Sequence, residues 1–318
     1  MLFRLAKIRF FLQNSYIGDF LYFYGIMKRI LITFALLIAG LPVWGIDREK
    51  DSLAFVNAEW KTTELEGGAT VMTAKIYIFD SPQSISIIKY PARKFRTELI
   101  HSPGDKAGKT SEIARREGAL MAMNGSYFNM KQLTPCTYFR IADQVLGETS
   151  ASEGFRVNGV IAIKNRRGRN IVITECEPSQ YEAVTGKWNS VLASGPVLVE
   201  DEKTVVPEIM KADANGNGSD SFYDKRHPRS AMGYDRKGNI YLIVIDGRHP
   251  GNAEGTSIYE TALICSFLNL EDAINLDGGG SSTLWHDEEG VLNHPSDNRT
   301  FDAQGERKVP NMCAFSTA

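Results

Sequence analysis

One apolar run constrains the fold of this chain more than any other feature. Residues Ile240–Ile245 read Ile-Tyr-Leu-Ile-Val-Ile, without the polar alternation of a half-exposed strand. Such a run is typical of a strand that is buried on both faces, because each face then needs apolar neighbours. The fold must therefore place a layer of structure on each side of this strand. The run ends abruptly at Asp246-Gly247-Arg248.

Most of the remaining pattern also predicts short strands. We expect them at Val71–Phe79, Ser84–Tyr90, Leu120–Met123, Val160–Ile163, Ile171–Thr174, Val197–Val199, Ala231–Tyr234 and Ala273–Leu276. Helical patterns occur at Thr110–Arg116 and at Ser257–Leu268, where Ser257 and Glu260 have the spacing of a capping box. We therefore predict the α+β class: a mixed β-sheet core with few helices, in a single strand-rich domain.

The first 45 residues have a different character from the rest. Met27-Lys28-Arg29 precedes the uncharged apolar run Ile30–Leu41, and Gly45 precedes a polar start, which together indicate a secretory signal peptide over 27–45. The run is shorter than the ~20 apolar residues that span a bilayer. Because this signal has its own Met27, we interpret residues 1–26 as an upstream over-translation. The mature domain, 46–318, is then expected to be exported, periplasmic or extracellular, with no membrane attachment after signal cleavage.

Charge and cysteine content exclude several classes of function. The 318 residues contain 36 Lys and Arg against 38 Asp and Glu, and removing residues 1–45 changes the formal net charge from −2 to −6. A chain with this net charge lacks the excess of basic residues that is typical of nucleic-acid binding. Its four cysteines lack the spacing of a zinc or redox motif, and in an oxidising compartment they allow up to two disulfides. Cys265, inside the second helical pattern, is expected to be a buried thiol.

Polar side chains that carry chemistry follow three of the predicted strands. Asp246 follows Ile240–Ile245, Asp277 follows Ala273–Leu276, and Asn124 follows Leu120–Met123. Strand ends are where α/β sheets build their sites, so this repetition predicts a functional site.

Two chemistries are consistent with these strand ends. Asp246 and Asp277 have the composition of an acid–base pair, although an Asp at a strand end is also a common turn former. The amides of Gly278–Gly280, with the Ser281 hydroxyl, have the composition of an anion site, although the glycines also suit a tight turn. Arg229 and Arg248 add guanidinium groups suited to phosphate or carboxylate.

Metal binding has weaker support in the sequence. The five histidines show no metal-ligand spacing, and three of them precede proline, which favours extended loop positions. The segment from Asp213 to Asp224 resembles a calcium loop. Its oxygen ligands would come from Asp213, Asn215, Asn217 and Asp224. Against calcium, Asp occupies the position usually held by a bidentate Glu, so a solvated turn is the alternative.

Six motifs occur in the order of one protein family. They are Asn124-Gly125-Ser126-Tyr127-Phe128, Ser194-Gly195-Pro196-Val197-Leu198, His227-Pro228-Arg229-Ser230-Ala231, Val244-Ile245-Asp246-Gly247-Arg248, Asn275-Leu276-Asp277-Gly278-Gly279-Gly280-Ser281-Ser282-Thr283 and Glu306-Arg307-Lys308-Val309-Pro310-Asn311. Together they resemble the phosphodiester glycosidase family over about residues 120–314, with the strands at 71–90 in the same domain. Ser126 and Ser194 stand where the family usually has glycine.

The resemblance implies a catalytic domain that hydrolyses a glycosyl phosphodiester at the glycosidic bond, removing a GlcNAc-like sugar and releasing a phosphomonoester. It assigns Asp277 or Asp246 to water activation or oxocarbenium stabilisation. It implies a phosphate clamp from Arg248, Arg229, Arg307, Gly278, Gly279, Gly280 and Ser281. Asn124 and Tyr127 would orient the sugar, and Ser194 and Arg140 would add substrate contacts. No cofactor is expected beyond a structural calcium ion.

Two other functions remain open at this point. A non-catalytic protein that binds phosphorylated or acidic envelope polysaccharide would use the same arginines and glycine amides, without an aligned carboxylate. A metal-dependent phosphodiesterase cutting the P–O bond would need clustered carboxylate and His ligands, which the spacing does not provide.

Overall fold

The computed structural model describes residues 47–142, 144–164, 170–206 and 220–317. Residues 47–318 cluster as one compact unit. The predicted signal peptide, the proposed start at Met27 and most of the calcium loop lie outside the described residues, and these interpretations stay predictions. Within the described ranges, no helix is long and apolar enough to cross a membrane.

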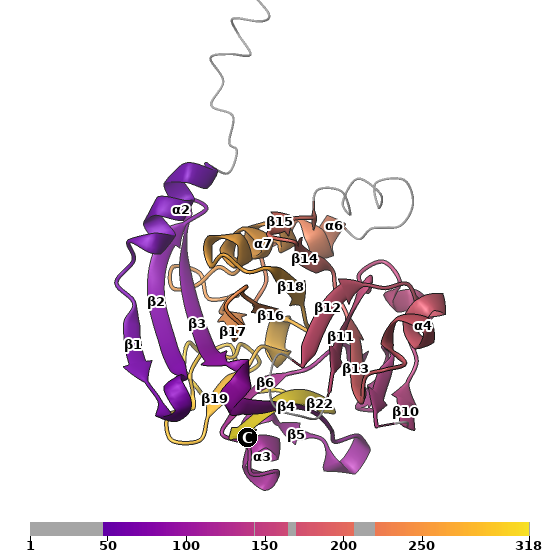
Figure 1. The fold of residues 1–318 in the computed structure, drawn as a ribbon. Coiled ribbons are helices and arrows are strands. Elements are labelled where there is room, and N and C mark those ends of the chain that lie inside the picture. The colour runs from indigo at the N-terminus through magenta and orange to yellow at the C-terminus, as the bar shows by residue number, and fades with distance from the viewer. Residues whose placement is uncertain (1–46, 143, 165–169, 207–219, 318) are drawn as a thin grey trace, which may run out of the picture. The chain divides into compact units, whose positions relative to one another are not determined.

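An eight-stranded sheet forms the centre of this unit (Figure 1). In spatial order it contains β1 (Lys61–Glu64), β2 (Thr70–Ile78), β3 (Ser81–Pro91), β17 (Asn239–Ile245), β16 (Arg229–Tyr234), β18 (Asp272–Asn275), β14 (Val197–Glu200) and β15 (Lys203–Thr204). Every pairing in it is antiparallel. The sheet is therefore antiparallel and not mixed as predicted. Tight connections such as the one between β16 and β17 can join only antiparallel neighbours, and the remaining pairings join segments that are distant in the sequence.

Two five-stranded sheets accompany the central one. One contains β10 (Gln144–Gly147), β9 (Phe139–Ile141), β13 (Ser190–Ser194), β11 (Gly159–Ile163) and β12 (Ile171–Glu175). The other contains β20 (Gly290–Val291), β19 (Leu284–His286), β6 (Met121–Asn124), β22 (Asn311–Thr317) and β4 (Phe95–His101). Two short pairs complete the strands: β5 (Gly108–Lys109) with β21 (Lys308–Val309), and β7 (Phe128–Asn129) with β8 (Thr134–Pro135).

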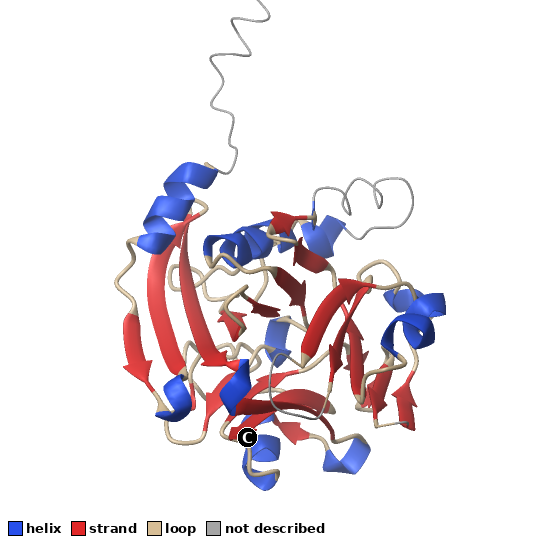
Figure 2. Ribbon diagram, in the orientation of Figure 1, coloured by secondary structure: helices blue, strands red, loops and turns tan. Residues whose placement is uncertain are grey.

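Helices are few among the strands in the described ranges (Figure 2). The α-helices are α2 (Arg48–Val56), α3 (Thr110–Arg116), α4 (Tyr181–Thr185), α6 (Asp220–Tyr223) and α7 (Ile258–Phe267). Short 3₁₀ turns lie at Glu66–Gly68, Ala92–Lys94, Gly104–Lys106, Ala151–Glu153, Pro178–Gln180 and Gly279–Ser281. The capping box is confirmed: the Ser257 hydroxyl accepts from the Glu260 amide, and the Glu260 carboxylate accepts from the Ser257 amide. The predicted α+β class is confirmed.

Strand β17 is buried on both faces, as its apolar run predicts. Leu242 and Val244 belong to a core that includes residues of both five-stranded sheets. Ile243 and Ile245 face the other way, into a core completed by α7 and by Phe55 of α2. The central sheet is thus held between two apolar layers, which fixes the positions of its strand ends.

Candidate active site

Two strand ends and one strand start in the centre of the sheet lie side by side. They form one edge of the sheet, meaning here the edge that runs across the strand ends. Strand β16 is antiparallel to both β17 and β18, so the carboxyl ends of those two strands lie beside the start of β16. Asp246 and Asp277 follow these ends, and Arg229 is the first residue of β16. Asn124, the last residue of β6, joins them because its Nδ2 donates to the Asp277 carbonyl at 2.6 Å. Residues far apart in the sequence therefore gather here.

Asp277 is the electrostatically unusual member of this group. Although the residue keeps some solvent contact, burial of its carboxyl raises its pKa, and this is the largest influence on it. The Ser281 hydroxyl, the positive charges of Arg156 and Arg307, and the Gly278 amide lower the pKa without cancelling the effect of burial. Asp277 is thus a carboxyl that holds its proton to a higher pH than an exposed aspartate does.

Two arginines approach the glycine-rich turn beside Asp277. Gly279 has a φ of +62°, and a Cβ there would lie 2.9 Å from an Arg248 Nη atom. A Cβ at Gly280 would overlap the paired Asp297 and Arg307 side chains. The positive φ favours glycine at 279, and the lack of a side chain at both positions lets the guanidinium groups come close to the backbone.

Arg248 and Arg307 differ in how far their charges are already paired. Arg307 donates twice to Asp297, at 2.5 and 2.9 Å, and this pairing raises its pKa. Arg248 is exposed and has no ion pair within the described residues, while partial burial and the Arg307 charge lower its pKa. Arg248 is therefore the cation at this edge with the most capacity left for an anionic ligand.

The turn itself offers fewer amides to an anion than its sequence predicts. The Gly279 amide donates to the Pro228 carbonyl at 2.8 Å, and the Gly278 amide is directed at Asp277. At most the Gly280 amide remains. The Ser281 hydroxyl is directed at Asp277, and the Ser282 and Thr283 hydroxyls are buried without a hydrogen-bond partner in the described residues, which leaves two donors beside the turn.

In contrast to Asp277, the Asp246 carboxylate is fully hydrogen-bonded. It is 1% exposed, and its two oxygens accept four hydrogen bonds, the capacity of a carboxylate. The donors are Ser84 Oγ at 2.7 Å, Asn293 Nδ2 at 3.0 Å, the His294 amide at 2.8 Å and His294 Nδ1 at 2.8 Å. Since no lone pair is left for a water molecule, Asp246 orients other groups and does not suit direct water activation.

Several predicted substrate contacts are instead used inside the protein. Arg229 is 2% exposed and donates to the carbonyls of Thr256, Phe222 and Lys225, and burial lowers its pKa to about 10. Arg140 donates to Glu182 and to the carbonyls of Thr185 and Trp188. Both guanidinium groups secure neighbouring loops, so the structure does not place them in a phosphate clamp.

The predicted sugar contacts are also engaged internally. The Asn124 amide is satisfied by Asp277, Ser230 and Thr283. The Tyr127 hydroxyl donates to the Gly195 carbonyl at 2.7 Å, and burial raises its pKa. The Ser194 hydroxyl donates to the Asn275 carbonyl at 2.8 Å. These side chains position the Asp277 segment and are not free to meet a sugar.

Two functional candidates were missed in the sequence. Arg156 lies 3.8 Å from the Tyr127 ring centroid, is paired with Glu153 at 2.5 Å, and acts electrostatically on Asp277. His294 is paired with Asp246. The polar run from Asn293 to Asp297 is the one sequence signal that could have drawn attention to His294.

Metal binding gains no geometric support. Within the described ranges, no group of three or more His, Cys, Asp or Glu side chains is arranged to hold a metal ion. Asp224 of the predicted calcium loop is exposed, and the other three proposed ligands fall outside those ranges. All four cysteines are free thiols, and the buried Cys265 has a pKa raised by burial to about 12, as expected of an unreactive thiol.

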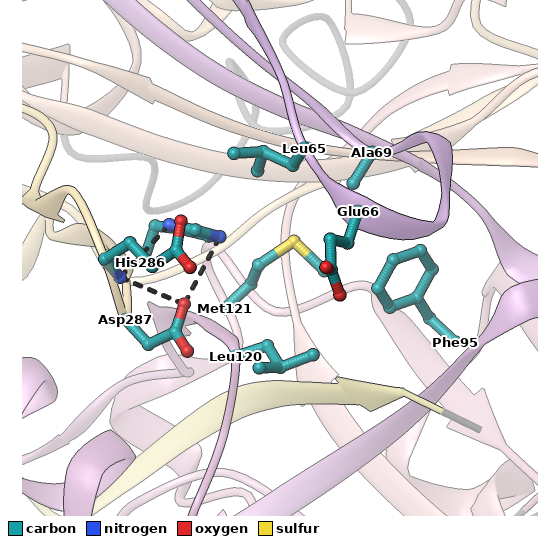
Figure 3. Close-up of a pocket in the computed structure, with 9 residues that line it drawn as sticks. Leu65, Glu66, Ala69, Phe95, Leu120, Met121, His286 and Asp287 are labelled. Atoms are coloured by element: carbon teal, nitrogen blue, oxygen red, sulfur yellow. Dashed lines mark hydrogen bonds and ion pairs between the residues drawn. The ribbon is translucent and has the colours of Figure 1, made fainter.

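A separate small pocket of about 70 Å³, partly open to solvent, lies away from this edge (Figure 3). Its lining residues are Leu65, Glu66, Ala69, Phe95, Leu120, Met121, His286, Asp287 and Glu288. Figure 3 shows Met121 and Glu66 between the Phe95 ring and the His286–Asp287 pair. Met121 pairs with His286 at the end of β6 opposite to Asn124. This pocket therefore includes none of the predicted site residues.

A family comparison agrees with this arrangement of motifs. The model of the phosphodiester glycosidase family (NAGPA) matches residues 117–316, which is more than half of the chain. The chain belongs to this family. The matched region contains Asn124, Asp246, Arg248, Asp277 and Arg307.

Curated relatives carry the name N-acetylglucosamine-1-phosphodiester alpha-N-acetylglucosaminidase. The Bos taurus protein is 27% identical over 243 residues, covering 71% of this chain and 44% of that protein. The Homo sapiens protein is 27% identical over 203 residues, covering 61% of this chain and 38% of that protein. The chain thus spans less than half the length of the curated relatives it matches.

Solved structures support the fold. The catalytic domain of the zebrafish enzyme of the same name, described as auto-inhibited by its pro-peptide, matches with a TM-score of 0.58 at 18% identity. That match covers 82% of this chain and 83% of the zebrafish one. A hypothetical protein from Synechocystis matches with a TM-score of 0.55 at 16% identity, covering 81% of this chain and 64% of that one. At these identities the likeness is one of fold.

Proposed function

We propose that this member of the family is an exported hydrolase that cleaves a glycosyl phosphodiester at the glycosidic bond. It would remove a GlcNAc-like sugar and release a phosphomonoester. The observation that carries this proposal is the placement of Asp277, whose pKa is raised by burial, beside the guanidinium groups of Arg248 and Arg307. One group can donate a proton and the other two can hold an anion at the same place.

The chemistry of the leaving group fits this combination. Breaking the bond between the anomeric carbon and the phosphate oxygen turns a singly charged phosphodiester into a phosphomonoester, whose second pKa is about 6. A carboxyl with a raised pKa is well matched to protonate a group of that basicity. The arginines would stabilise the charge that develops on phosphate in the transition state.

The sugar and the compartment are further parts of the proposal. The GlcNAc-like sugar follows from the printed names of the mammalian relatives, which the chain matches over less than half their length. Export follows from the signal-like residues 27–45. Amino-terminal sequencing of the protein secreted by its native cell should begin near residue 46. A mature protein that keeps residues 1–26 would contradict both export by this signal and the start at Met27.

A labelled-water experiment tests the reaction. The purified protein is incubated with GlcNAc-1-phospho-6-mannose in H₂¹⁸O, and the products are analysed by mass spectrometry. The proposal predicts free GlcNAc carrying ¹⁸O and mannose 6-phosphate whose phosphate group is unlabelled. Label in the phosphate group of a product, or release of GlcNAc-1-phosphate, would indicate P–O cleavage instead. Binding of a phosphorylated polysaccharide without any turnover of phosphodiesters would favour the non-catalytic alternative.

No cofactor is needed in the proposed reaction, because side chains supply the acid and the anion site. Dialysis against EDTA should leave the activity unchanged. A loss of activity that Ca²⁺ restores and Mg²⁺ does not would support a structural calcium ion at Asp213, Asn215, Asn217 and Asp224. Selective restoration by calcium is expected of such a loop because its many oxygen ligands suit the larger ion.

A further inference from the structure

We propose that His294 is the base that activates water in this reaction and that Asp246 is its positioning residue. The inference rests on the proposed function and adds to it the group that receives the proton of the attacking water. It starts from the pairing of His294 Nδ1 with Asp246 Oδ2 at 2.8 Å.

The contact with Asp246 fixes the imidazole in a defined state. Since Asp246 is buried and accepts from three other donors, the Nδ1 of a neutral His294 must carry the hydrogen and donate it. Nε2 is then the unprotonated nitrogen, and it has no hydrogen-bond partner within the described residues. The His294 side chain remains 30% exposed, so the ring as a whole is not closed off from solvent.

The ring of His294 is also held in orientation. Phe301 stacks on it with 3.8 Å between centroids and 12° between planes. Asp246 at one edge and Phe301 on one face together restrict the rotation of the ring. A base held in this way can deprotonate water without first being ordered.

The loop that carries His294 runs beside the proposed phosphate site. At one end, Asn293 Nδ2 bridges Asp246 and the Ser282 carbonyl at 3.0 Å each. At the other end, Asp297 pairs with Arg307. His294 therefore lies between an anchor to the glycine-rich turn and an anchor to an arginine proposed to bind phosphate.

The step balances with the groups present. Nε2 of His294 takes a proton from water as the water oxygen bonds to the anomeric carbon. The bond from that carbon to the phosphate oxygen breaks, and the electron pair leaves with the phosphomonoester. Asp246 stabilises the imidazolium that forms, and Asp277 supplies a proton to the leaving phosphate.

Charged groups around His294 set the direction of its pH dependence. Asp246 after β17 and Asp302 in the following loop favour the imidazolium. His249, which faces Phe301 and Asp246, and Lys75 of β2, whose Nζ lies 4.9 Å from the Phe301 centroid, oppose it when charged. Because the base acts only when Nε2 is unprotonated, activity should be lost on the acid side of the pH profile.

The chain offers a matched control at the pocket in Figure 3. His286 also faces a carboxylate, with 3.4 Å between Nε2 and Asp287 Oδ1, but Asp287 is exposed and the pair lies at the opposite end of β6 from Asn124. His286→Gln therefore removes a paired histidine without touching the strand ends that carry Asp246 and Asp277.

The test measures pH profiles of kcat and KM on GlcNAc-1-phospho-6-mannose for wild type, His294→Gln, Asp246→Asn and His286→Gln. His294→Gln should lower kcat about 10²–10³-fold, leave KM within a few-fold, and abolish the acid limb of the profile. Asp246→Asn should move the acid limb to lower pH, because the imidazolium loses its counter-charge. His286→Gln should keep the wild-type profile.

Several results would overturn the assignment. One is a His294→Gln variant with near-native kcat or an unchanged acid limb, and another is a folded Asp246→Asn variant whose limb does not move. If His286→Gln loses as much activity as His294→Gln, the effect is not specific to the proposed base. A wild-type protein that does not cleave the glycosidic bond removes the proposed function, and the base with it. Activity in wild type combined with an unaffected His294→Gln removes the base alone.

Discussion

Asp277 and Asp246 occupy corresponding places in the fold but have opposite surroundings. Each follows a buried central strand and precedes a glycine, and β16 separates the two strands. Asp246 accepts four hydrogen bonds from three residues. Asp277 is desolvated with only partial compensation, so its pKa is raised. The sheet therefore fixes where the two carboxyl groups stand, while the loops packed on them decide whether each one orients a partner or exchanges a proton.

The largest expected effect is the loss of activity when Asp277 is replaced. Asp277→Asn should lower kcat on a glycosyl phosphodiester about 10²–10⁴-fold, because the amide cannot protonate the leaving phosphate. The basic limb of the wild-type pH profile, where the raised pKa of Asp277 is crossed, should disappear in this variant. Steady-state kinetics across pH measure both effects. Near-native kcat in Asp277→Asn would end the assignment of an acid at this position.

The next effect separates the two arginines beside Asp277. Arg248→Ala should lower kcat/KM about 10²-fold without lowering the melting temperature, because Arg248 is exposed and has no ion pair among the described residues. Arg307→Ala should lower both kcat/KM and the melting temperature, because Asp297 loses a bidentate partner. Kinetics and thermal unfolding are measured together, with the exposed Arg93→Ala as the control. Arg248→Ala with wild-type kinetics would remove the phosphate contact from the proposal.

A third prediction uses stability to contrast the two aspartates. Asp246→Asn should lower the unfolding free energy by about 1–3 kcal/mol. The new side-chain NH₂ group would face donors that now bond to a carboxylate oxygen, and those donors would lose their acceptor. Asp277→Asn should unfold at a higher temperature than wild type above neutral pH. Its raised folded-state pKa means that the wild type loses stability as pH rises from the unfolded-state pKa to the folded one.

Denaturant titrations at two pH values measure this contrast. The exposed Asp105→Asn serves as the control and should match wild type at both pH values. Equal stability losses in Asp246→Asn and Asp277→Asn would show that the two environments do not differ in the way described.

The smallest expected effect concerns the backbone conformation of Arg248, which follows β17, and of Gly279, which follows β18. Arg248 has a φ of +65° and Gly279 has a φ of +62°, so an arginine and a glycine adopt the same left-handed region. Arg248→Gly should therefore raise the unfolding free energy by about 0.5–1 kcal/mol while lowering activity as Arg248→Ala does. Urea unfolding of the glycine and alanine variants gives the difference. A glycine variant no more stable than the alanine variant would mean that the conformation costs little.

Six of the eight central strands and the capped helix α7 could be predicted because their signals are local, whereas the short outer strands β1 and β15 were not. The apolar run of β17 needs burial on both faces, and Ser257 with Glu260 marks a helix start within four residues. Helix α2 was missed because only Asp51 and Phe55 of its nine residues are buried, which leaves no apolar periodicity to detect. The antiparallel order of the sheet was also missed, since it depends on pairings between distant segments.

The position of the candidate site was predictable, and the role proposed for each residue was much less so. Asp277, Asp246 and Asn124 could be singled out because each follows an apolar strand. That Arg229 binds three carbonyl groups depends on loops brought in by tertiary structure. The pairing of His294 with Asp246 joins residues 48 positions apart, and no local pattern encodes it. Long-range partners, and not residue types, decide which polar groups remain free for a ligand.

The location of β16 has a consequence for how the protein loses activity. Every residue of β16 is buried, and the strand is hydrogen-bonded on both sides. Its amide hydrogens should then exchange only through global opening, as in the most protected unit of a fold. Because β16 holds the two aspartate-bearing strands apart, their spacing can change only when that unit opens. The spacing of the two carboxyl groups should then survive partial unfolding at the periphery.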